Sequence, residues 1–171
     1  MDIKSIIKSE IKDFKTPKDN RKLKWDDLED DIQVRSQKKD KKFKLGGKWK
    51  RFKENREGFK VFTVDGEWVR NNLSVIFGHG GHGLVHEFIP HDEIWIASHH
   101  YNIKGLNGES VKCGCNKGNQ KVSDEYYDSC AIHEIAENIM MKTKKMNYWT
   151  AHNISLDIEE QIGLIPHDEI Q

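Results

Sequence analysis

Two residues of metal-ligating types lie four positions apart in the segment His133-Glu134-Ile135-Ala136-Glu137. On a helix, residues at i and i+4 lie on one face, about 40° apart, so His133 and Glu137 can approach the same ion. Zinc accepts both imidazole nitrogen and carboxylate oxygen as ligands in proteins. The alternative interpretation is a pair on the helix surface that makes only a weak contact between successive turns.

Glu134 has a different place on the same helix. It lies about 100° from His133 around the helix axis, at the rim of the apolar stripe and away from the face that would ligate an ion. In the motif His-Glu-x-x-His, two helical histidines bind zinc and the intervening Glu is the general base. Glu137 stands where that motif has its second histidine, and Glu134 is the candidate catalytic base.

A second predicted helix, from Tyr148 to about Ile162, supplies a third ligand. His152 and Glu159 share one face of it, and the tight connection at 146–147 predicts an antiparallel helix pair. His152 then completes a three-ligand zinc site with one position open for water, as in catalytic zinc sites. Glu159 is either a fourth ligand or an acceptor that orients a ligating histidine. Another divalent transition metal is the alternative to zinc.

The elements that must position these residues have clear end signals. The first helix is predicted from about Asp124 to Lys144 after Ser123 as its N-cap, and Asn147 is the N-cap of the second. Before them, apolar alternation predicts five short strands and a tight hairpin turn at Asp65-Gly66. The strands are residues 59–64, 67–70, 73–77, 84–89 and 93–97. The predicted fold class is α+β, with a small antiparallel sheet packed against two C-terminal helices that carry the metal site, and a basic N-terminal helical arm.

The net charge of zero hides a division along the chain. Residues 1–60 hold 20 Lys/Arg and 12 Asp/Glu, so +8, and residues 61–171 hold 8 and 16, so −8. We therefore predict a charge-rich arm over residues 1–57, beginning with a helix over 2–15, and a metal-binding domain over 58–171. A basic arm suggests an anionic partner, and solvated lysine-rich helices are the alternative.

Two further clusters contain metal-ligating residue types. Three histidines lie in or after a glycine-rich stretch, for which we favour a turn with exposed histidines: His79, His82 and His86. Three cysteines could bind a structural zinc ion: Cys113, Cys115 and Cys130. A lone Cys-x-Cys in a polar loop is a weak zinc signal, and Cys130 is expected in the core of its helix.

Five blocks of sequence follow one another in order between residues 61 and 159. They are Val64-Asp65-Gly66-x-x-Val69-Arg70, Gly80-Gly81-His82, Phe88-Ile89-Pro90-x-x-Glu93-Ile94-Trp95-Ile96, His133-Glu134-x-x-Glu137 and Tyr148-x-x-Ala151-His152-x-x-Ser155-x-x-x-Glu159. In this order they resemble a family of uncharacterised zincin-like proteins encoded by phages and other mobile elements. The resemblance implies a metallopeptidase-like site on the two helices, with His82 in the cleft. The Cys113–Cys115 loop and the lysine-rich arm are not part of the pattern.

Two functional hypotheses follow. The first is a metal-dependent hydrolase acting on a peptide or protein, in which Glu134 takes a proton from water activated by the ion. Tyr148 or His82 would stabilise the oxyanion. The second is a phage accessory binding protein with a structural metal or none. Its basic arm would contact a host protein or nucleic acid, with three aromatic residues available for stacking: Trp25, Trp49 and Phe52.

Composition also bears on location. No apolar run approaches the length of a membrane span, and the first 14 residues lack the apolar region of a secretory signal. Three cysteines, an odd number, do not predict a disulfide framework. We therefore expect no membrane partner and a cytoplasmic location, in the host cell if the protein is phage-encoded.

Overall fold

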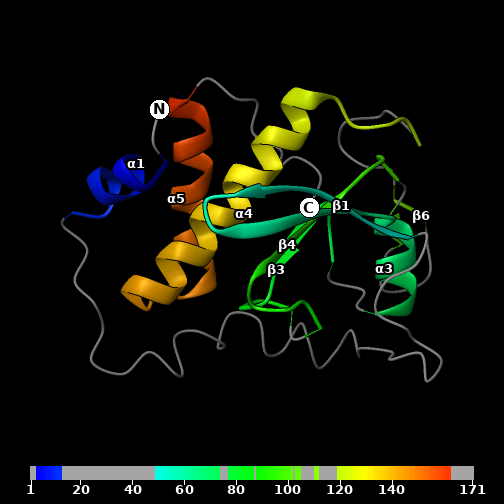
Figure 1. Ribbon diagram of the computed structural model, residues 1–171, viewed down its shortest axis with the longest axis horizontal. Helices are drawn as coiled ribbons and strands as arrows, with labels where there is room; N and C mark the ends of the chain where they lie inside the picture. The colour runs from blue at the N-terminus through cyan, green and yellow to red at the C-terminus, as the bar shows by residue number, and fades with distance from the viewer. Residues whose placement is uncertain are drawn as a thin grey trace.

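The computed structural model describes residues 3–12, 49–73, 77–86, 88–101, 103–104, 110–111 and 119–162. Three residues named above lie outside these ranges: Trp25, Cys113 and Cys115. The described part of the chain forms a four-stranded sheet with helices packed on it (Figure 1). A separate two-stranded ribbon consists of β5 (Ile103–Lys104) and β6 (Ser110–Val111).

The main sheet has the strand order β1-β2-β4-β3. β1 (Lys50–Arg56) and β2 (Phe59–Val64) form an antiparallel hairpin, closed at residues 57–58 with φ of 52° and 84°. Positive φ at both turn residues gives the twist that matches the flanking strands. β2 pairs in parallel with β4 (Glu93–Ala97), and β3 (Gly80–His82) pairs antiparallel with β4.

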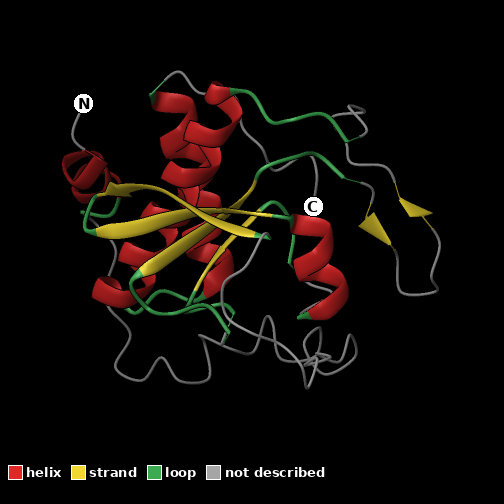
Figure 2. Ribbon diagram, turned by 45° about the vertical axis from the view of Figure 1, so that its right-hand side comes forward, coloured by secondary structure: helices red, strands yellow, loops and turns green. Residues whose placement is uncertain are grey.

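The helices lie on both faces of the sheet (Figure 2). α1 (Ile3–Glu10), α4 (Asp124–Lys144) and α5 (Tyr148–Gln161) share a core with one face. α3 (Gly66–Asn72) contributes to a second core on the other face. None of the helices in the described residues has the length and apolarity needed to cross a membrane.

β4 is buried on both faces because a core lies on each side of it. Ile94 and Ile96 belong to the core that contains α4, whereas Trp95 belongs to the core that contains α3. Successive side chains on a strand point to opposite faces, so a doubly covered strand is apolar throughout. Trp49 stacks on Trp68 with ring centroids 4.4 Å apart and meets Trp95 edge-on at 5.4 Å. This packing fixes β4, and through it β3, against α4.

The predicted caps of α4 and α5 are confirmed. Ser123 Oγ accepts a hydrogen bond from Tyr126 N at 3.1 Å, and Asn147 Oδ1 accepts one from Thr150 N at 2.9 Å. Lys145 follows α4 in the left-handed conformation, with φ 53°. The chain therefore leaves α4 and enters α5 within a few residues, and such a short connection makes neighbouring helices antiparallel.

The hairpin turn predicted at Asp65-Gly66 is wrong. Asp65 is the N-cap of α3, and its Oδ1 accepts a hydrogen bond from Trp68 N at 3.0 Å. Residues 67–70 are therefore helical and not a returning strand. An Asp before Gly suits either a turn or an N-cap. The helix forms because Val69 and Leu73, four residues apart, then both enter the second core.

The α+β class is confirmed, but the sheet is mixed and not purely antiparallel, because β2 and β4 run parallel. The predicted strand over 84–89 is wrong, since its described residues form turns. The strand lies just before it, in the glycine-rich stretch, as β3. Residues 74–76 of the predicted strand 73–77 lie outside the described residues.

The boundary predicted after residue 57 falls inside a hairpin, since β1 pairs with β2 across it. The N-terminal segment also contributes four isoleucines to the core that contains α4 and α5: Ile3, Ile6, Ile7 and Ile11. Their helical spacing gives α1 one apolar face, and that face packs on the domain. Residues 3–12 and 49–57 are therefore part of the folded body, while residues 13–48 lie outside the described ranges.

Candidate metal centre

Three side chains from α4 and α5 bring one ligating atom each to a common point. His133 Nε2 lies 3.0 Å from Glu137 Oε2 and 2.9 Å from His152 Nδ1. His152 Nδ1 is 3.2 Å from the same carboxylate oxygen. Ligands at about 2.0–2.1 Å from a tetrahedral zinc ion lie about 3.3 Å from one another. The three atoms therefore need to separate by only a few tenths of an ångström to hold an ion.

These three residues are almost completely buried, with His133 and Glu137 1% exposed and His152 3% exposed. Burial disfavours protonated His133, but hydrogen bonds to Glu137 and Glu159 outweigh burial and raise its pKa to about 10. Burial also disfavours the Glu137 carboxylate, but the histidines that donate to it hold its pKa well below the usual range. A proton on His133 thus supplies the positive charge that this buried cluster needs in the absence of an ion.

Glu159 lies at the other ring nitrogen of His133. Its Oε1 is 3.4 Å from His133 Nδ1, and the side chain is fully buried. An acceptor at Nδ1 holds the imidazole so that Nε2 faces Glu137 and His152, which is the usual arrangement around metal-ligating histidines. Of the two roles predicted for Glu159, this position suits orientation of His133.

Tyr148 and Trp149 mark the side on which the cluster approaches the surface. The Tyr148 ring stacks on His152 at 5.3 Å, and its hydroxyl lies 3.3 Å from His152 Nδ1. Tyr148 is half-buried, and Trp149 is 43% exposed. A hydroxyl at this position can donate a hydrogen bond to an oxygen atom that acquires negative charge next to the three ligands.

His82 reaches the same carboxylate from β3. Its Nε2 lies 2.8 Å from Glu137 Oε1. Its Nδ1 lies 3.2 Å from Asn138 Nδ2 and 3.3 Å from Leu84 N, both of which are donors. Neutral His82 therefore carries its proton on Nε2 and donates it to Glu137. Sequence reasoning missed Asn138, although it lies one helical turn after Glu134 and so on the same face of α4.

Glu134 is not at the rim of α4 as predicted, because β3 covers that side of the helix. It is only 4% exposed, and a Cβ on Gly80 would lie 3.1 Å from Glu134 Cγ. Glu134 Oε2 is 3.9 Å from His82 Nε2. Burial, with the charge of Glu137, raises the pKa of Glu134 to about 7. A carboxyl group with such a pKa can take up and return a proton at neutral pH.

The other histidines of the glycine-rich stretch are buried, which contradicts the predicted exposed turn. His79 stacks on Tyr101 with ring centroids 5.0 Å apart, and His86 tilts against Phe77 at 5.5 Å. Burial and the neighbouring His82 lower the pKa of His86 to about 3, so its ring is neutral. Neither His79 nor His86 belongs to a group of candidate metal ligands in the described residues.

Cys130 is a buried free cysteine in the core around α4, as predicted. Burial, together with the carboxylates of Glu134 and Glu159, raises the pKa of its thiol. The thiol is therefore protonated and unreactive. A site that also involved Cys113 and Cys115 would fall partly outside the described residues.

The described residues thus contain two buried groups that could hold a metal ion, and the groups share Glu137. One consists of His133, Glu137 and His152, and the other of His82, Glu134 and Glu137. The chain matches no protein-family model, no curated protein and no solved structure. Its function is therefore inferred from the geometry of these buried residues.

Proposed function

We propose that the protein is a metal-dependent hydrolase, with zinc as the ion and a peptide or protein as the substrate. The observation that carries the proposal is the convergence of His133 Nε2, Glu137 Oε2 and His152 Nδ1 within 3.2 Å of one another. Beside them lies Glu134, with a pKa of about 7. The resemblance of the ordered sequence blocks to zincin-like proteins of phages and mobile elements supports the metal site.

Several residues near this point would have roles in hydrolysis. An ion held by the three ligands would polarise a carbonyl group and lower the pKa of water. Glu134 would accept the proton of the attacking water and return it to the leaving group. Tyr148, whose hydroxyl lies 3.3 Å from His152 Nδ1, would donate to the developing oxyanion. Glu159 would keep the His133 ring in its ligating orientation.

The first test is the metal content of the protein. Wild-type protein purified without a chelator should hold zinc, and His133→Ala should hold one ion per chain fewer, because only two ligands of that ion remain. His91→Ala is the matched control, since His91 is exposed and belongs to neither candidate group. Inductively coupled plasma mass spectrometry gives the number of ions per chain, and circular dichroism checks the fold. A wild-type protein that holds no zinc, manganese or iron, and takes up none on addition, would refute the metal centre.

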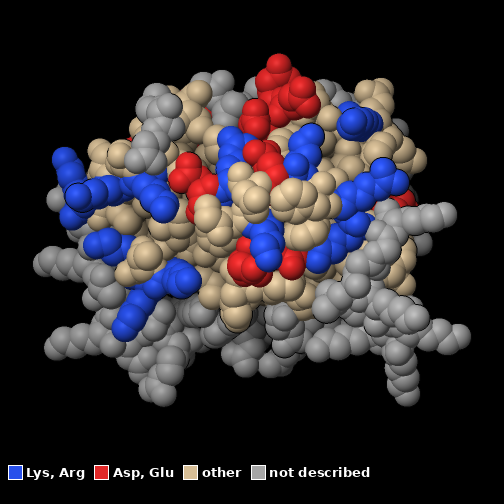
Figure 3. All heavy atoms as spheres, in the orientation of Figure 1, with Lys and Arg blue, Asp and Glu red and all other residues tan. Residues whose placement is uncertain are grey.

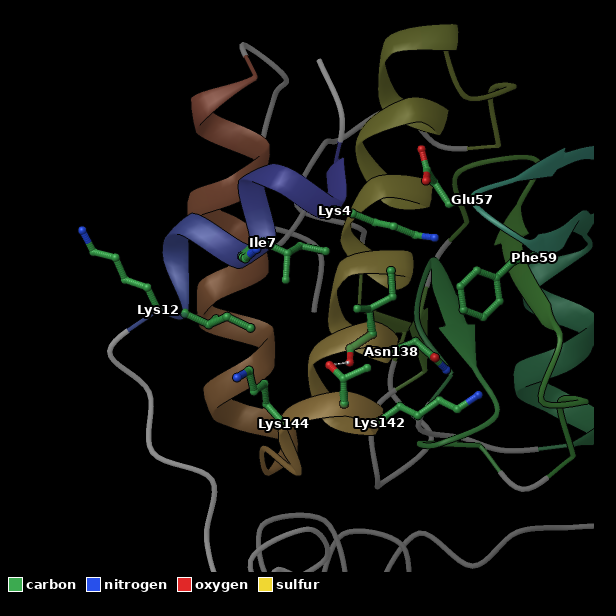
Figure 4. Close-up of a pocket in the computed structure, with 12 residues that line it drawn as sticks. Lys4, Ile7, Lys12, Glu57, Phe59, Asn138, Lys142 and Lys144 are labelled. Atoms are coloured by element: carbon green, nitrogen blue, oxygen red, sulfur yellow. Dashed lines mark hydrogen bonds between the residues drawn. The ribbon is translucent and has the colours of Figure 1, made fainter.

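A basic cavity favours a second candidate function, the binding of an anionic partner such as nucleic acid. The cavity has a volume of about 740 Å³ and lies where α1, α4 and the β1–β2 turn meet. Five lysines line it: Lys4, Lys8, Lys12, Lys142 and Lys144 (Figure 4). Glu57 is the single acidic residue among the lining residues. Figure 3 shows Lys and Arg side chains on the left, the side on which α1 lies in Figure 1, and also across the middle and right of this face. Phosphates are attracted to such a concentration of lysines.

Charge reversal at the cavity tests this second function. Lys142→Glu/Lys144→Glu should weaken the binding of a fluorescent single-stranded oligonucleotide, and the slope of log affinity against log salt should fall by about 1 for each lost phosphate contact. Lys121→Glu is the control, because Lys121 is exposed and does not line the cavity. Nucleic-acid bases would stack on Phe52, which is 56% exposed, because Trp49 already stacks on Trp68. Binding that is indifferent to salt, or equally weakened in the control, would argue against nucleic acid.

A further inference from the structure

We propose that the centre holds two metal ions, with Glu137 as a carboxylate that bridges them. His133, Glu137 and His152 hold the first ion, and His82, Glu134 and Glu137 hold the second. The inference rests on the proposed metal centre for the first ion. It adds a binding site on the opposite side of the bridging carboxylate, next to β3.

The two oxygen atoms of Glu137 face different partners. Oε2 lies 3.0 Å from His133 Nε2 and 3.2 Å from His152 Nδ1. Oε1 lies 2.8 Å from His82 Nε2, on the β3 side. In two-metal hydrolytic sites the ions lie about 3.5–4 Å apart, a spacing that one carboxylate can span with an oxygen on each ion. The orientation of Glu137 is therefore that of a bridge between two sets of ligands.

The second set is a compact group of three ligands on rigid elements. The ligating atoms of His82, Glu134 and Glu137 all lie within 4.8 Å of one another, and all three residues are buried. Glu134 Oε2 is 3.9 Å from His82 Nε2. A Cβ at Gly80 would lie 3.3 Å from Glu134 Oε1, which is a tight contact, so the glycine eases the approach of β3 to Glu134. The backbone of β3 thus approaches α4 closely enough to bring His82 to the two carboxylates.

The charges of the cluster also favour a second cation. Three buried carboxylates belong to the cluster: Glu134 and Glu137, which share one candidate group, and Glu159, which lies 3.4 Å from His133 Nδ1. One divalent ion at the first site compensates two negative charges. A second ion, between Glu134 and Glu137, compensates the third and removes the repulsion between two carboxylates that share a water-poor site.

Ligation by His82 Nε2 requires that the ring proton move to Nδ1, which faces Asn138 at 3.2 Å. The amide of Asn138 has the same shape when it is turned over, and Oδ1 then accepts that proton. Asn138 can therefore donate to Nδ1 without the ion and accept from it with the ion, whereas Leu84 N, 3.3 Å from Nδ1, loses its acceptor when the ion binds. An acceptor of this kind behind a ligating histidine is the common arrangement at metal sites.

The number of ions per chain tests the proposal. Protein carrying Cys113→Ser/Cys115→Ser, so that these thiols bind nothing, is stripped with a chelator and dialysed against buffered excess zinc. We expect two ions per chain, one in His82→Ala, one in His133→Ala and none in Glu137→Ala, because Glu137 serves both sites. His86→Phe is the matched control, since His86 is buried beside His82 but is in neither ligand group, and it should keep two ions.

A second measurement needs no variant. Two Mn²⁺ ions that share a carboxylate couple magnetically, so the protein loaded with manganese should lose the six-line electron paramagnetic resonance signal of isolated Mn²⁺. One ion per chain, with an uncoupled signal, would overturn the second site and leave the first in place. Two ions in both the parent protein and His82→Ala would also overturn it, because the additional ion would then lie elsewhere. No bound ion at all would refute the proposed metal centre itself.

Discussion

Replacing Glu134 by Gln should lower the rate of peptide hydrolysis by about 10²- to 10⁴-fold, which is the usual contribution of a general base. The amide has nearly the same shape as the carboxyl group and still fits against Gly80, so the fold should survive. His133, Glu137 and His152 remain, and the ion they hold should remain with them. What is lost is a buried group with a pKa of about 7 that accepts a proton at neutral pH, and with it a carboxylate ligand of the proposed second ion.

The measurement combines metal content, melting temperature and cleavage of a broad peptide library. Glu125→Gln is the matched control, because Glu125 is exposed in the first turn of the same helix and should tolerate the change. Cleavage that survives in Glu134→Gln would remove Glu134 from the reaction. Wild-type protein that holds its metal and cleaves nothing would favour the anion-binding function. Loss of every ion in Glu134→Gln would make this residue essential to the first metal site as well.

The affinity for zinc should rise at least about 100-fold between pH 6 and pH 8. Without the ion, His133 is protonated across this range, because its carboxylate partners raise its pKa to about 10. A ligating histidine must be neutral, so every ion that binds at His133 displaces a proton. One displaced proton makes the association constant about tenfold larger per pH unit. The affinity rises with pH because the pKa of His133 is raised, so that low pH favours the bound proton and high pH favours the bound ion.

Two measurements test this coupling between zinc binding and proton release. Competition with a chelator of known affinity gives the zinc constant at each pH, and calorimetry in two buffers of different ionisation enthalpy counts the protons released. The slope should be unchanged in His91→Ala, since His91 is exposed and outside the cluster. An affinity that does not change with pH would mean that His133 is already neutral in the protein without metal.

The C-terminal helices could be predicted because their signals are local. Ser123 and Asn147 are cap residues, and the apolar and metal-ligating residues between them recur at helical intervals. The i,i+4 spacing puts His133 and Glu137 on one face whatever surrounds the helix. His152 lies against α4 because the connection between α4 and α5 is short. These features do not depend on the packing of the rest of the chain.

The sequence could not predict which sides of α4 the sheet covers. Glu134 was expected at the rim of the helix because a helical wheel contains no information about a neighbouring strand. The strand that covers it, β3, is only three residues long and has no clear sequence signal. His79 and His86 are buried by aromatic neighbours, His79 by Tyr101 and His86 by Phe77, although glycine-rich surroundings are typical of an exposed turn. Glycines in this stretch admit a close approach between backbone and side chains, as Gly80 does for Glu134.

The extent of the domain could not be predicted from charge either. Charge division along the chain placed a boundary after residue 57, but strand pairing and apolar contacts decide what folds together. β1 is rich in charged residues and is held by pairing with its partner strand β2. α1 packs its isoleucines into the core and leaves Lys4 and Lys8 exposed. A charge-rich segment can therefore belong to the folded body through strand pairing, as β1 does, or through one apolar face, as α1 does.

The burial of α4 has a consequence for amide hydrogen exchange. The middle of this helix packs on the sheet, on α5 and on α1, and its buried residues run from Tyr127 to Met141. Backbone amides in such a segment exchange only when the whole molecule opens, whereas frayed ends exchange through local opening. Because an ion bound by the folded state raises the free energy of global opening, metal should slow exchange throughout the middle of α4. Amides at the frayed ends of α1, which exchange through local opening, should exchange at the same rate with and without metal.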